Sequence, residues 1–209
     1  VIATDISESS RMGICGEIFD SVEPKIVIDH HASVTLRSDN LWIDPEASSA
    51  SEMVFYVAEQ ISAITEKEMK DIITSNAAKA VLAGIVTDTG RFTFKNTRPE
   101  TLETAGLLIE LGGDISEVCY NLFDRKTKQK FRLSAKARSE VQFYYDDKFA
   151  LTVVPYSQFV EYNAGPDGVD DVVVLFDPVE GGFQVVDEHR AEQERDAQTH
   201  AVAQQHGNA

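Results

Sequence analysis

The stretch KIVIDHHASV places a carboxylate and two imidazoles in a row, Asp29, His30 and His31, directly after an apolar run. Two other carboxylates occupy comparable places, because Asp5 ends the apolar stretch VIATD and Asp88 follows the apolar stretch AAKAVLAGIV. Carboxylate oxygens and imidazole nitrogens together suit Mn²⁺, Mg²⁺, Fe²⁺ or Zn²⁺. A fold that brings these five side chains to one place can therefore hold divalent cations.

Each of these groups has a plausible task at such a site. Asp5 can bridge two cations while His30 and Asp88 fill further coordination positions, and two adjacent cations hold a hydroxide and clamp an in-line displacement at phosphorus. Successive residues of an extended chain alternate in direction, so His31 can meet phosphate oxygens instead. Asp29 can orient an imidazole through a hydrogen bond. The candidate metal ligands are thus Asp5, His30 and Asp88, and the candidate catalytic residues are Asp29 and His31.

Ordinary structural roles compete with these assignments. An Asp-His-His run can be a polar loop, Asp5 can form a turn, and TDTG at 87–90 can simply end a helix. The serines of the DPEASSASE stretch are interpreted as caps without chemistry: Ser48, Ser49 and Ser51. Three further histidines lie in a polar tail, where we expect them to be solvated: His189, His200 and His206. Only the joint occurrence of the acidic and imidazole groups favours a site.

The elements that must position these groups alternate between strands and helices. Residues 1–5 and 25–29 are apolar strands separated by a helical stretch at 11–22, which predicts a parallel βαβ unit whose strand ends meet at one edge. After a short strand at 40–44, a helix is expected to begin at Ser49, with Glu52 completing a capping box. A second capping pair, Thr65 with Glu68, predicts a buried helix that delivers Asp88 at its end.

The second half of the sequence predicts smaller elements. A helix is expected from Thr97, with Glu100 as its capping partner and Pro99 in the first turn, followed by a short helix at 114–125. Residues 126–145 are basic and predict a connector helix whose Lys and Arg side chains are most simply a solvated face. Strands at 148–155, 170–178 and 181–187, with a short helix at 156–162, predict a second lobe. From residue 188 the chain has almost no large apolar side chains and would not build a core.

The composition of the chain limits the kinds of partner that it can bind. The chain has 35 acidic and 19 basic side chains, a net charge of -16 over 209 residues, so it repels a long phosphate backbone and should not bind duplex DNA. A polyanionic substrate would have to be short or drawn by bound metal. Cys15 and Cys119 match no metal spacing and are interpreted as reduced core thiols of a cytoplasmic protein. No apolar run approaches the roughly 20 residues of a membrane span. Because VIATD is a strand already under way, we expect further sequence before Val1.

Three stretches, VIATDIS, IVIDHHAS and LAGIVTDTGRFTF, closely resemble in order and separation motifs two, three and four of the DHH phosphoesterase superfamily. The sequence between and after these motifs also resembles the small members of the superfamily, the oligoribonucleases that degrade nanoRNA and the phosphoadenosine-phosphate phosphatases. The resemblance covers roughly residues 1–159. It implies an α/β fold with a three-layer parallel-sheet catalytic domain at 1–125, a connector helix at 126–145, a small and incomplete α/β substrate-binding domain at 146–187, and an atypical tail at 188–209.

The resemblance also implies a site. Two manganese ions would be held with Asp5 as the bridging ligand and His30 and Asp88 as further ligands, and His31 would contact the scissile phosphate. Magnesium is the alternative metal. Arg91, in the same motif as Asp88, is assigned to substrate binding. The sequence departs from the family in two places, because no first motif with its His and two Asp precedes Val1, and no glycine-rich GGGH-type loop follows residue 187. The chain therefore resembles a fragment.

Three functions remain in competition. The first is a metal-dependent phosphodiesterase or phosphatase acting on short oligonucleotides, linear dinucleotides or 3'-phosphoadenosine 5'-phosphate, with the cyclic-dinucleotide phosphodiesterases as a neighbouring branch. The second is a non-catalytic nucleotide-binding module. The third is a structural fragment with a vestigial metal site. The motif set favours the first for the intact protein, and the oligomeric state is left open, a homodimer included.

Overall fold

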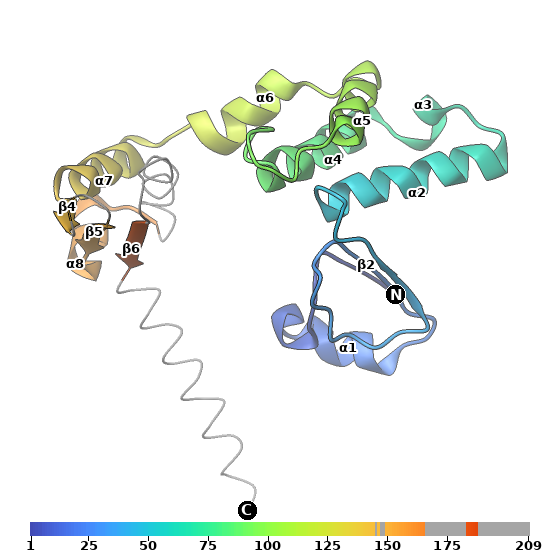
Figure 1. Ribbon diagram of the computed structural model, residues 1–209, viewed down its shortest axis with the longest axis horizontal. Coiled ribbons are helices and arrows are strands. Elements are labelled where there is room, and N and C mark those ends of the chain that lie inside the picture. Colours follow the sequence, from blue (N-terminus) through green and yellow to red (C-terminus); the bar gives the residue numbers. More distant parts are fainter. Residues whose placement is uncertain (145, 147–148, 166–182, 188–209) are drawn as a thin grey trace, which may run out of the picture. The chain divides into compact units, whose positions relative to one another are not determined.

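The computed structural model describes residues 1–144, 146, 149–165 and 183–187 (Figure 1). The chain divides into two compact units, which are here named the N-terminal unit, Val1–Asp124, and the C-terminal unit, Arg125–Ala209. The elements of the N-terminal unit are β1 (Ile2–Thr4), the 3-10 turn η1 (Ser9–Met12), α1 (Cys15–Ser21), β2 (Ile26–Asp29), β3 (Asn40–Ile43), α2 (Ala50–Thr65), α3 (Met69–Ile72), α4 (Ser75–Asp88), α5 (Pro99–Glu110), α6 (Ile115–Cys119) and the π-helical turn η2 (Tyr120–Asp124).

A parallel sheet of β1, β2 and β3 carries the strand ends on which the candidate site depends. β2 lies in the middle, with Ala3 opposite Val27 on one side and Asp29 opposite Ile43 on the other. Within the described part of the chain, β1 pairs with β2 alone, so its outer edge has no neighbour. The predicted parallel βαβ unit is confirmed, because α1 links β1 to β2.

Each face of this sheet packs on a helix, because side chains alternate between the two faces along a strand. The outer strand β3 is less covered, since Leu41 and Trp42 are exposed. On one face Ala3 and Val27 pack with Phe19 of α1. On the other face Ile28 packs with Met53 of α2. Figure 1 shows α1 and α2 on opposite sides of β2. The prediction of a layered α/β fold with a parallel sheet is therefore confirmed.

The helices beyond the sheet pack around α4. Its buried side chains Leu82 and Ile85 join Phe55 of α2, Leu108 of α5 and Val118 of α6 in the largest core cluster. The small, apolar AAKAVLAGIV stretch allows this close packing on several sides. As expected, the helix ends at Asp88.

Gly84 allows α2 and α4 to approach each other closely. A Cβ placed on Gly84 would lie 2.0 Å from Oγ and 2.7 Å from Cβ of Ser51. No side chain larger than hydrogen fits there unless one of the helices moves. Because Asp88 lies one turn beyond Gly84 on the same helix, this contact helps to set where Asp88 stands.

One predicted cap is confirmed and one is wrong. The Ser49 hydroxyl accepts a hydrogen bond from the Glu52 backbone N–H at 3.0 Å and so begins α2. Thr65 does not begin a helix but ends α2, since Glu66 follows in the left-handed region with φ 55°. The buried helix α4 is capped by Thr74 instead, whose hydroxyl accepts from Ala77 at 3.2 Å.

Two more local predictions are corrected. Helix α5 begins at Pro99 with Arg98 as its N-cap rather than Thr97, which fits the preference of proline for the first helical position. Cys15 is exposed and Cys119 half-buried, so Cys15 is no core thiol. The register of α1 explains this, because its sheet-facing contact is made by Phe19.

The C-terminal unit is a second small sheet with helices. Its described elements are α7 (Lys128–Ser139), β4 (Gln142–Tyr144), β5 (Phe149–Val154), α8 (Tyr156–Tyr162) and β6 (Phe183–Asp187). β4 is antiparallel to β5, and β5 is parallel to β6. Leu133 and Ala137 of α7 pack with Val154 and Phe159 as its core.

The basic segment departs from its expected form. The helix expected to run to residue 145 ends at Ser139, and β4 follows because Phe143 and Tyr144 favour extended backbone. The strand expected at 170–178 and the tail at 188–209, with His189, His200 and His206, lie outside the described residues. Among the helices that are described, none combines the length and apolar character that crossing a membrane requires.

Candidate metal centre

The candidate site begins where β1 and β2 end. Asp29 is the last residue of β2 and lies in the interior, and His30 and His31 follow it. Asp5 follows β1 with φ 58°, in the left-handed region that aspartate tolerates better than most residues. Its backbone N–H still donates to the Ile28 carbonyl at 3.1 Å. The sheet therefore holds Asp5 beside the residues that end β2.

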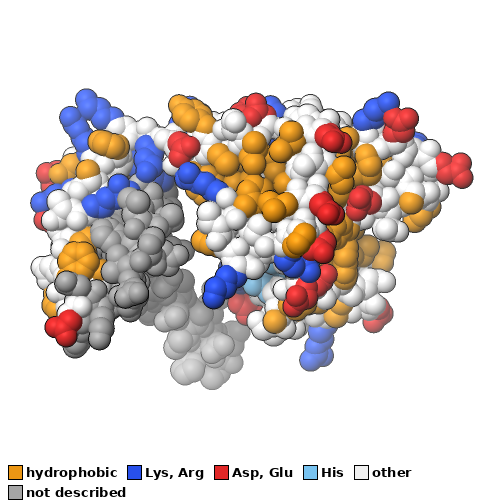
Figure 2. Space-filling view, turned by 45° about the horizontal axis from the view of Figure 1, so that its top comes forward, with side chains coloured by type: hydrophobic (Ala, Val, Ile, Leu, Met, Phe, Trp, Pro, Cys, Tyr) orange, Lys and Arg blue, Asp and Glu red, His pale blue; other side chains and the backbone are white. Residues whose placement is uncertain are grey.

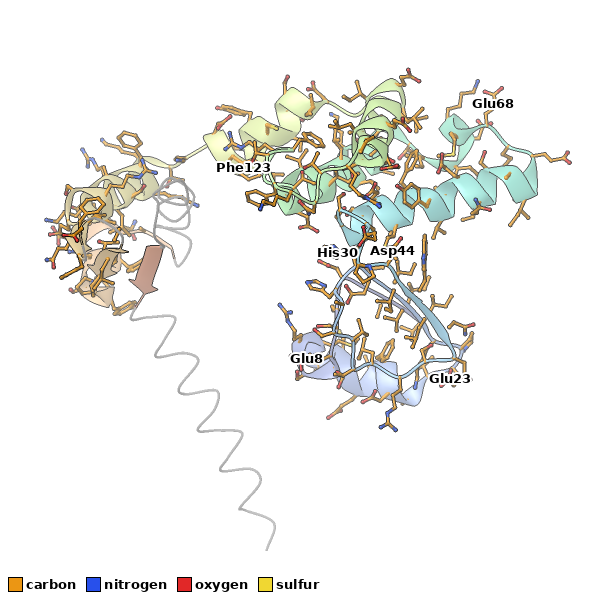
Figure 3. All side chains as sticks on the ribbon, viewed as in Figure 1. Glu8, Glu23, His30, Asp44, Glu68 and Phe123 are labelled. Carbon is orange, nitrogen blue, oxygen red and sulfur yellow. The ribbon has the colours of Figure 1, made fainter. Side chains whose placement is uncertain are left out.

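His30 lies between two carboxylates from distant parts of the sequence. Its Nε2 is 3.4 Å from Asp5 Oδ1 and 3.6 Å from Asp88 Oδ2. Figure 3 shows His30 where the sheet meets the N-terminal end of α2. Asp5, Asp29, His30 and His31 each offer one ligand atom within 4.8 Å of the others. This is the spacing of donors that can share a cation, and the mixture of oxygen and nitrogen donors fits Mn²⁺, Mg²⁺ or Zn²⁺.

Asp29 orients His31. Its Oδ1 accepts a hydrogen bond from the His31 backbone N–H at 3.0 Å and lies 2.7 Å from Nδ1 of the same ring. A carboxylate at Nδ1 favours the tautomer with the proton on Nδ1, which leaves Nε2 available. The buried Oδ2 of Asp29 has no hydrogen-bond partner. A buried carboxylate oxygen without a partner is costly, so it is consistent with a group that is completed by a bound ion or water.

Asp88 joins the cluster from the end of α4. Partial burial raises the pKa of the Asp88 carboxyl, the charge of Asp5 raises that pKa further, and His30 and His31 oppose the shift. Two neighbouring carboxylates repel each other unless a positive charge lies between them. A divalent cation held by Asp5 and Asp88 would supply that charge. The electrostatics therefore fit a metal ligand set.

The backbone at Asp88 is held by a residue that the sequence analysis missed. Asn96 Nδ2 donates to the Asp88 carbonyl at 3.0 Å and to the Ser48 carbonyl at 2.9 Å. The Ser48 N–H in turn donates to Oε2 of the buried Glu52 at 2.6 Å. Glu52 Oε1 accepts from Tyr56 at 2.7 Å. A buried polar network thus joins the start of α2 to the end of α4.

Arg91 is placed differently from the five cluster residues. Gly90, Arg91 and Phe92 all have positive φ, between 53° and 65°, so the chain turns sharply after α4. The Arg91 guanidinium lies 4.2 Å from the centre of the Phe123 ring, and its Nη1 is 3.3 Å from Asp124 Oδ1. The structure thus brings together Asp5, Asp29, His30, His31 and Asp88, while the side chain of Arg91 contacts η2.

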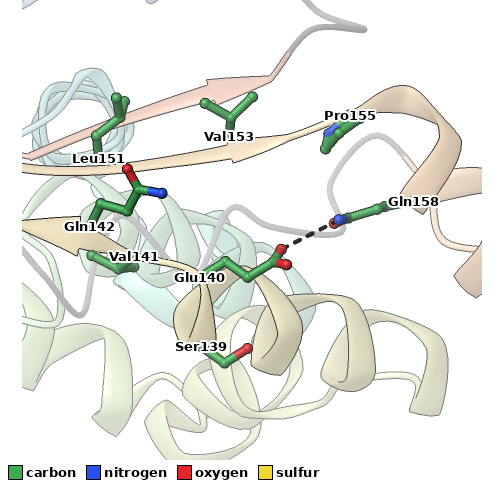
Figure 4. A pocket seen from close by; sticks show the side chains of 8 residues that line it. All are labelled: Ser139, Glu140, Val141, Gln142, Leu151, Val153, Pro155 and Gln158. Atoms are coloured by element: carbon green, nitrogen blue, oxygen red, sulfur yellow. Dashed lines mark hydrogen bonds between the residues drawn. The ribbon is translucent and has the colours of Figure 1, made fainter.

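A separate pocket lies in the C-terminal unit (Figure 4). It has a volume of about 530 Å³ and lies between the end of α7, β4, β5 and the start of α8. Glu140 is the charged residue of its lining, and Gln158 Nε2 donates to Glu140 Oε2 at 3.4 Å. A carboxylate there disfavours an anionic ligand, so this hollow does not resemble a phosphate site.

Comparison with known proteins identifies a family for the part of the chain that holds most of the cluster. The model of the DHH family, N-terminal domain, matches residues 1–85, which include four of the five cluster residues. Residues 1–85 therefore belong to the DHH family. Asp88 lies three residues beyond the match, so its assignment to the cluster rests on its contact with His30.

Curated relatives extend the similarity along the chain. It is 33% identical over 171 residues to the "Bifunctional oligoribonuclease and PAP phosphatase NrnA" of Bacillus subtilis, covering 77% of this chain and 52% of that protein. It is 31% identical over 186 residues to the protein of the same name from Thermus thermophilus, covering 87% and 50%. The chain therefore spans about half the length of these relatives.

A solved structure supports the fold. The exopolyphosphatase-related protein of Bacteroides fragilis superposes with a TM-score of 0.77 over 90% of this chain and 55% of its own, at 21% identity. At that identity the likeness concerns the α/β architecture.

Proposed function

We propose that this DHH-family chain is the catalytic part of a metal-dependent phosphoesterase that hydrolyses short oligonucleotides or linear dinucleotides, and also 3'-phosphoadenosine 5'-phosphate. One observation carries the proposal: His30 Nε2 lies within 3.6 Å of carboxylate oxygens of both Asp5 and Asp88. Three donors from three distant segments meet at the edge of a parallel sheet, where α/β proteins bind ligands.

The cluster residues would have different roles in this reaction. Asp5, His30 and Asp88 would hold divalent cations, manganese first and magnesium as the alternative, and Asp5 would be the ligand shared by two of them. When bound, such cations would supply an activated water and offset the charge that develops on the phosphoryl group. His31, fixed through Nδ1 by Asp29, would present Nε2 to a phosphate oxygen. In its protonated form it donates a hydrogen bond there and stabilises negative charge.

The proposed substrates are short for an electrostatic reason. With a net charge of -16, the protein repels long phosphate chains over most of its surface. A dinucleotide or a nucleoside bisphosphate presents few charges, and the cations can attract them locally. Two relatives are named as oligoribonucleases and PAP phosphatases, and these names are consistent with substrates that carry few phosphates.

The test is hydrolysis of a linear dinucleotide and of 3'-phosphoadenosine 5'-phosphate while Mn²⁺ is titrated. In the intact protein, with its first motif, we expect Mn²⁺-dependent release of product, and we expect His30→Ala and Asp88→Ala to abolish it. Asp71→Ala, at an exposed position of α3, is the matched control and should retain turnover. Unchanged turnover in either site variant contradicts the assignment. Binding of nucleotide with Mn²⁺ but without hydrolysis favours the non-catalytic module instead.

A further inference from the structure

The charge of this acidic chain is distributed very unevenly. Residues 125–139 contain seven of its 19 basic side chains and no acidic one. These seven are Arg125, Lys126, Lys128, Lys130, Arg132, Lys136 and Arg138. Five of them lie on α7. In the space-filling view, Lys and Arg side chains gather on the C-terminal unit (Figure 2). The segment is therefore a local cation surface on a protein that otherwise repels anions.

Two of these cations and an aromatic ring share the exposed face of α7. Lys128, Phe131 and Arg132 stand at i, i+3 and i+4, so their side chains neighbour one another. All three are exposed, and Phe131 keeps 64% of its surface accessible. Among the described residues, Lys128 and Arg132 form no ion pair with a carboxylate. We name this set, Lys128, Phe131 and Arg132, the basic helix face.

A hollow adjoins the basic helix face. It has a volume of about 350 Å³, and Gln129, Tyr162 and Asn163 line it together with Lys128 and Arg132. These side chains offer donors and acceptors of the kind that base edges use. Glu161 is the acidic residue of the lining.

We propose that the basic helix face binds single-stranded oligonucleotides, with Lys128 and Arg132 contacting phosphates and Phe131 stacking on a base. Alternating cationic and aromatic groups are how proteins hold single strands without reading their sequence. The exposed ring of Phe131 lies between two cations and is suited to stacking on a base. It is not part of the core cluster of the C-terminal unit. The face would recruit strands that are longer than a dinucleotide.

An anionic membrane fits the same charges less well. A helix that lies on a membrane inserts an apolar face between the lipids. In α7 the apolar face is already used, because Leu133 and Ala137 are fully buried in the core of the unit. Phe131 is the large apolar side chain that α7 leaves exposed.

The test is binding rather than hydrolysis, so that it can fail independently of the proposed function. Fluorescence anisotropy of a labelled short oligoadenylate is measured in EDTA across a salt series. The charge variant is Lys128→Gln with Arg132→Gln, the ring variant is Phe131→Ala, and the control is Lys70→Gln with Lys79→Gln. The control cations belong to the N-terminal unit and are paired with Glu68 and Glu117.

We expect the unaltered chain to bind and the control variant to bind equally well. The charge variant should bind more weakly and lower the slope of log affinity against log salt by about 1.4, which corresponds to two phosphate contacts on a single strand. Phe131→Ala should weaken binding roughly fivefold or more and leave the slope unchanged. No binding by the unaltered chain, or equal binding by the charge variant, overturns the proposal. So does binding to phosphatidylserine vesicles that depends on the same residues in place of binding to the oligonucleotide.

Discussion

Asn96 holds the carbonyl of Asp88, with Nδ2 at 3.0 Å, and the same Nδ2 lies 2.9 Å from the carbonyl of Ser48. The end of α4 and the loop before α2 are thereby fixed to each other, although they are far apart in the sequence. The position of Asp88, a candidate metal ligand, consequently depends on a side chain that is not itself one of the cluster residues.

Replacing Asn96 by alanine should loosen Asp88. The two carbonyls lose a shared donor, so we expect a loss of about 1–2 kcal/mol in the free energy of unfolding. We also expect weaker Mn²⁺ binding, measured by isothermal titration calorimetry on protein that is still folded. Asn121→Ala is the control, because Asn121 donates to the Glu117 carbonyl at an exposed position away from the cluster. Unchanged Mn²⁺ affinity in Asn96→Ala would show that the contact serves stability alone.

Gly84→Ala should disturb α4 more than a helix propensity scale suggests. Alanine usually stabilises a helix interior relative to glycine by roughly 0.5–1 kcal/mol, but here its Cβ would overlap Ser51. We expect a lower urea midpoint and weaker Mn²⁺ binding. Gly106→Ala is the matched control, since a Cβ on Gly106 meets nothing within 4 Å and should leave the protein as stable or more so. Adding Ser51→Gly to Gly84→Ala should restore Mn²⁺ affinity, and no recovery would refute the steric account.

Asp88→Asn should stabilise the protein in EDTA and abolish its stabilisation by Mn²⁺. Burial and the charge of Asp5 raise the pKa of Asp88, so the fold favours the protonated carboxyl. The contribution of Asp88 to stability is therefore present below its ordinary pKa and is lost as the pH rises through the raised value. At neutral pH the charge opposes folding, and asparagine removes it.

Thermal unfolding in EDTA and in Mn²⁺ measures both effects. Asp71→Asn, at an exposed position, should change neither melting temperature appreciably. A lower melting temperature for Asp88→Asn in EDTA would contradict the electrostatic argument. Equal stabilisation of Asp88→Asn and the unaltered chain by Mn²⁺ would remove Asp88 from the ligand set.

Tyr56 should make the protein sensitive to alkali. Its burial and its hydrogen bond to Glu52 raise the pKa of the Tyr56 hydroxyl to about 12. Below its ordinary pKa of 10.0 the hydroxyl is neutral in both states, and between 10.0 and about 12 only the unfolded chain ionises it. Stability should therefore fall across this range, and Tyr56→Phe should reduce the fall. Urea midpoints on both sides of the range measure it, with the exposed Tyr120→Phe as the control. A parallel fall in Tyr56→Phe would mean that another group is responsible.

Much of the site follows from local sequence. Asp29 and Asp88 end a strand and a helix, and Asp5 directly follows a strand. Each of these elements has a clear apolar pattern, so the positions of the three residues along the chain were predictable. The parallel pairing of β1 and β2 then brings the first two together. What brings Asp88 to His30 is packing of α4 against other helices, which the motif resemblance anticipated and residue spacing alone did not.

Other features left no trace in the sequence. Asn96 lies in a turn between α4 and α5, where asparagine is common, and nothing local distinguishes its bridging role. The Thr65 and Thr97 predictions failed because a threonine followed by a glutamate three residues later also arises by chance near helix ends. The contact of Arg91 with Phe123 depends on three successive left-handed residues, of which only Gly90 is a recognisable signal.

The outer side of β1 has consequences for every measurement suggested above. Among the described residues β1 has a neighbouring strand on one side only, so its other side presents a row of backbone donors and acceptors, and its first residue, Ile2, is 62% exposed. Such a border can template the addition of another extended segment, including one from a second molecule. Titrations of this chain therefore belong at low protein concentration, with light scattering alongside to detect any association through that border.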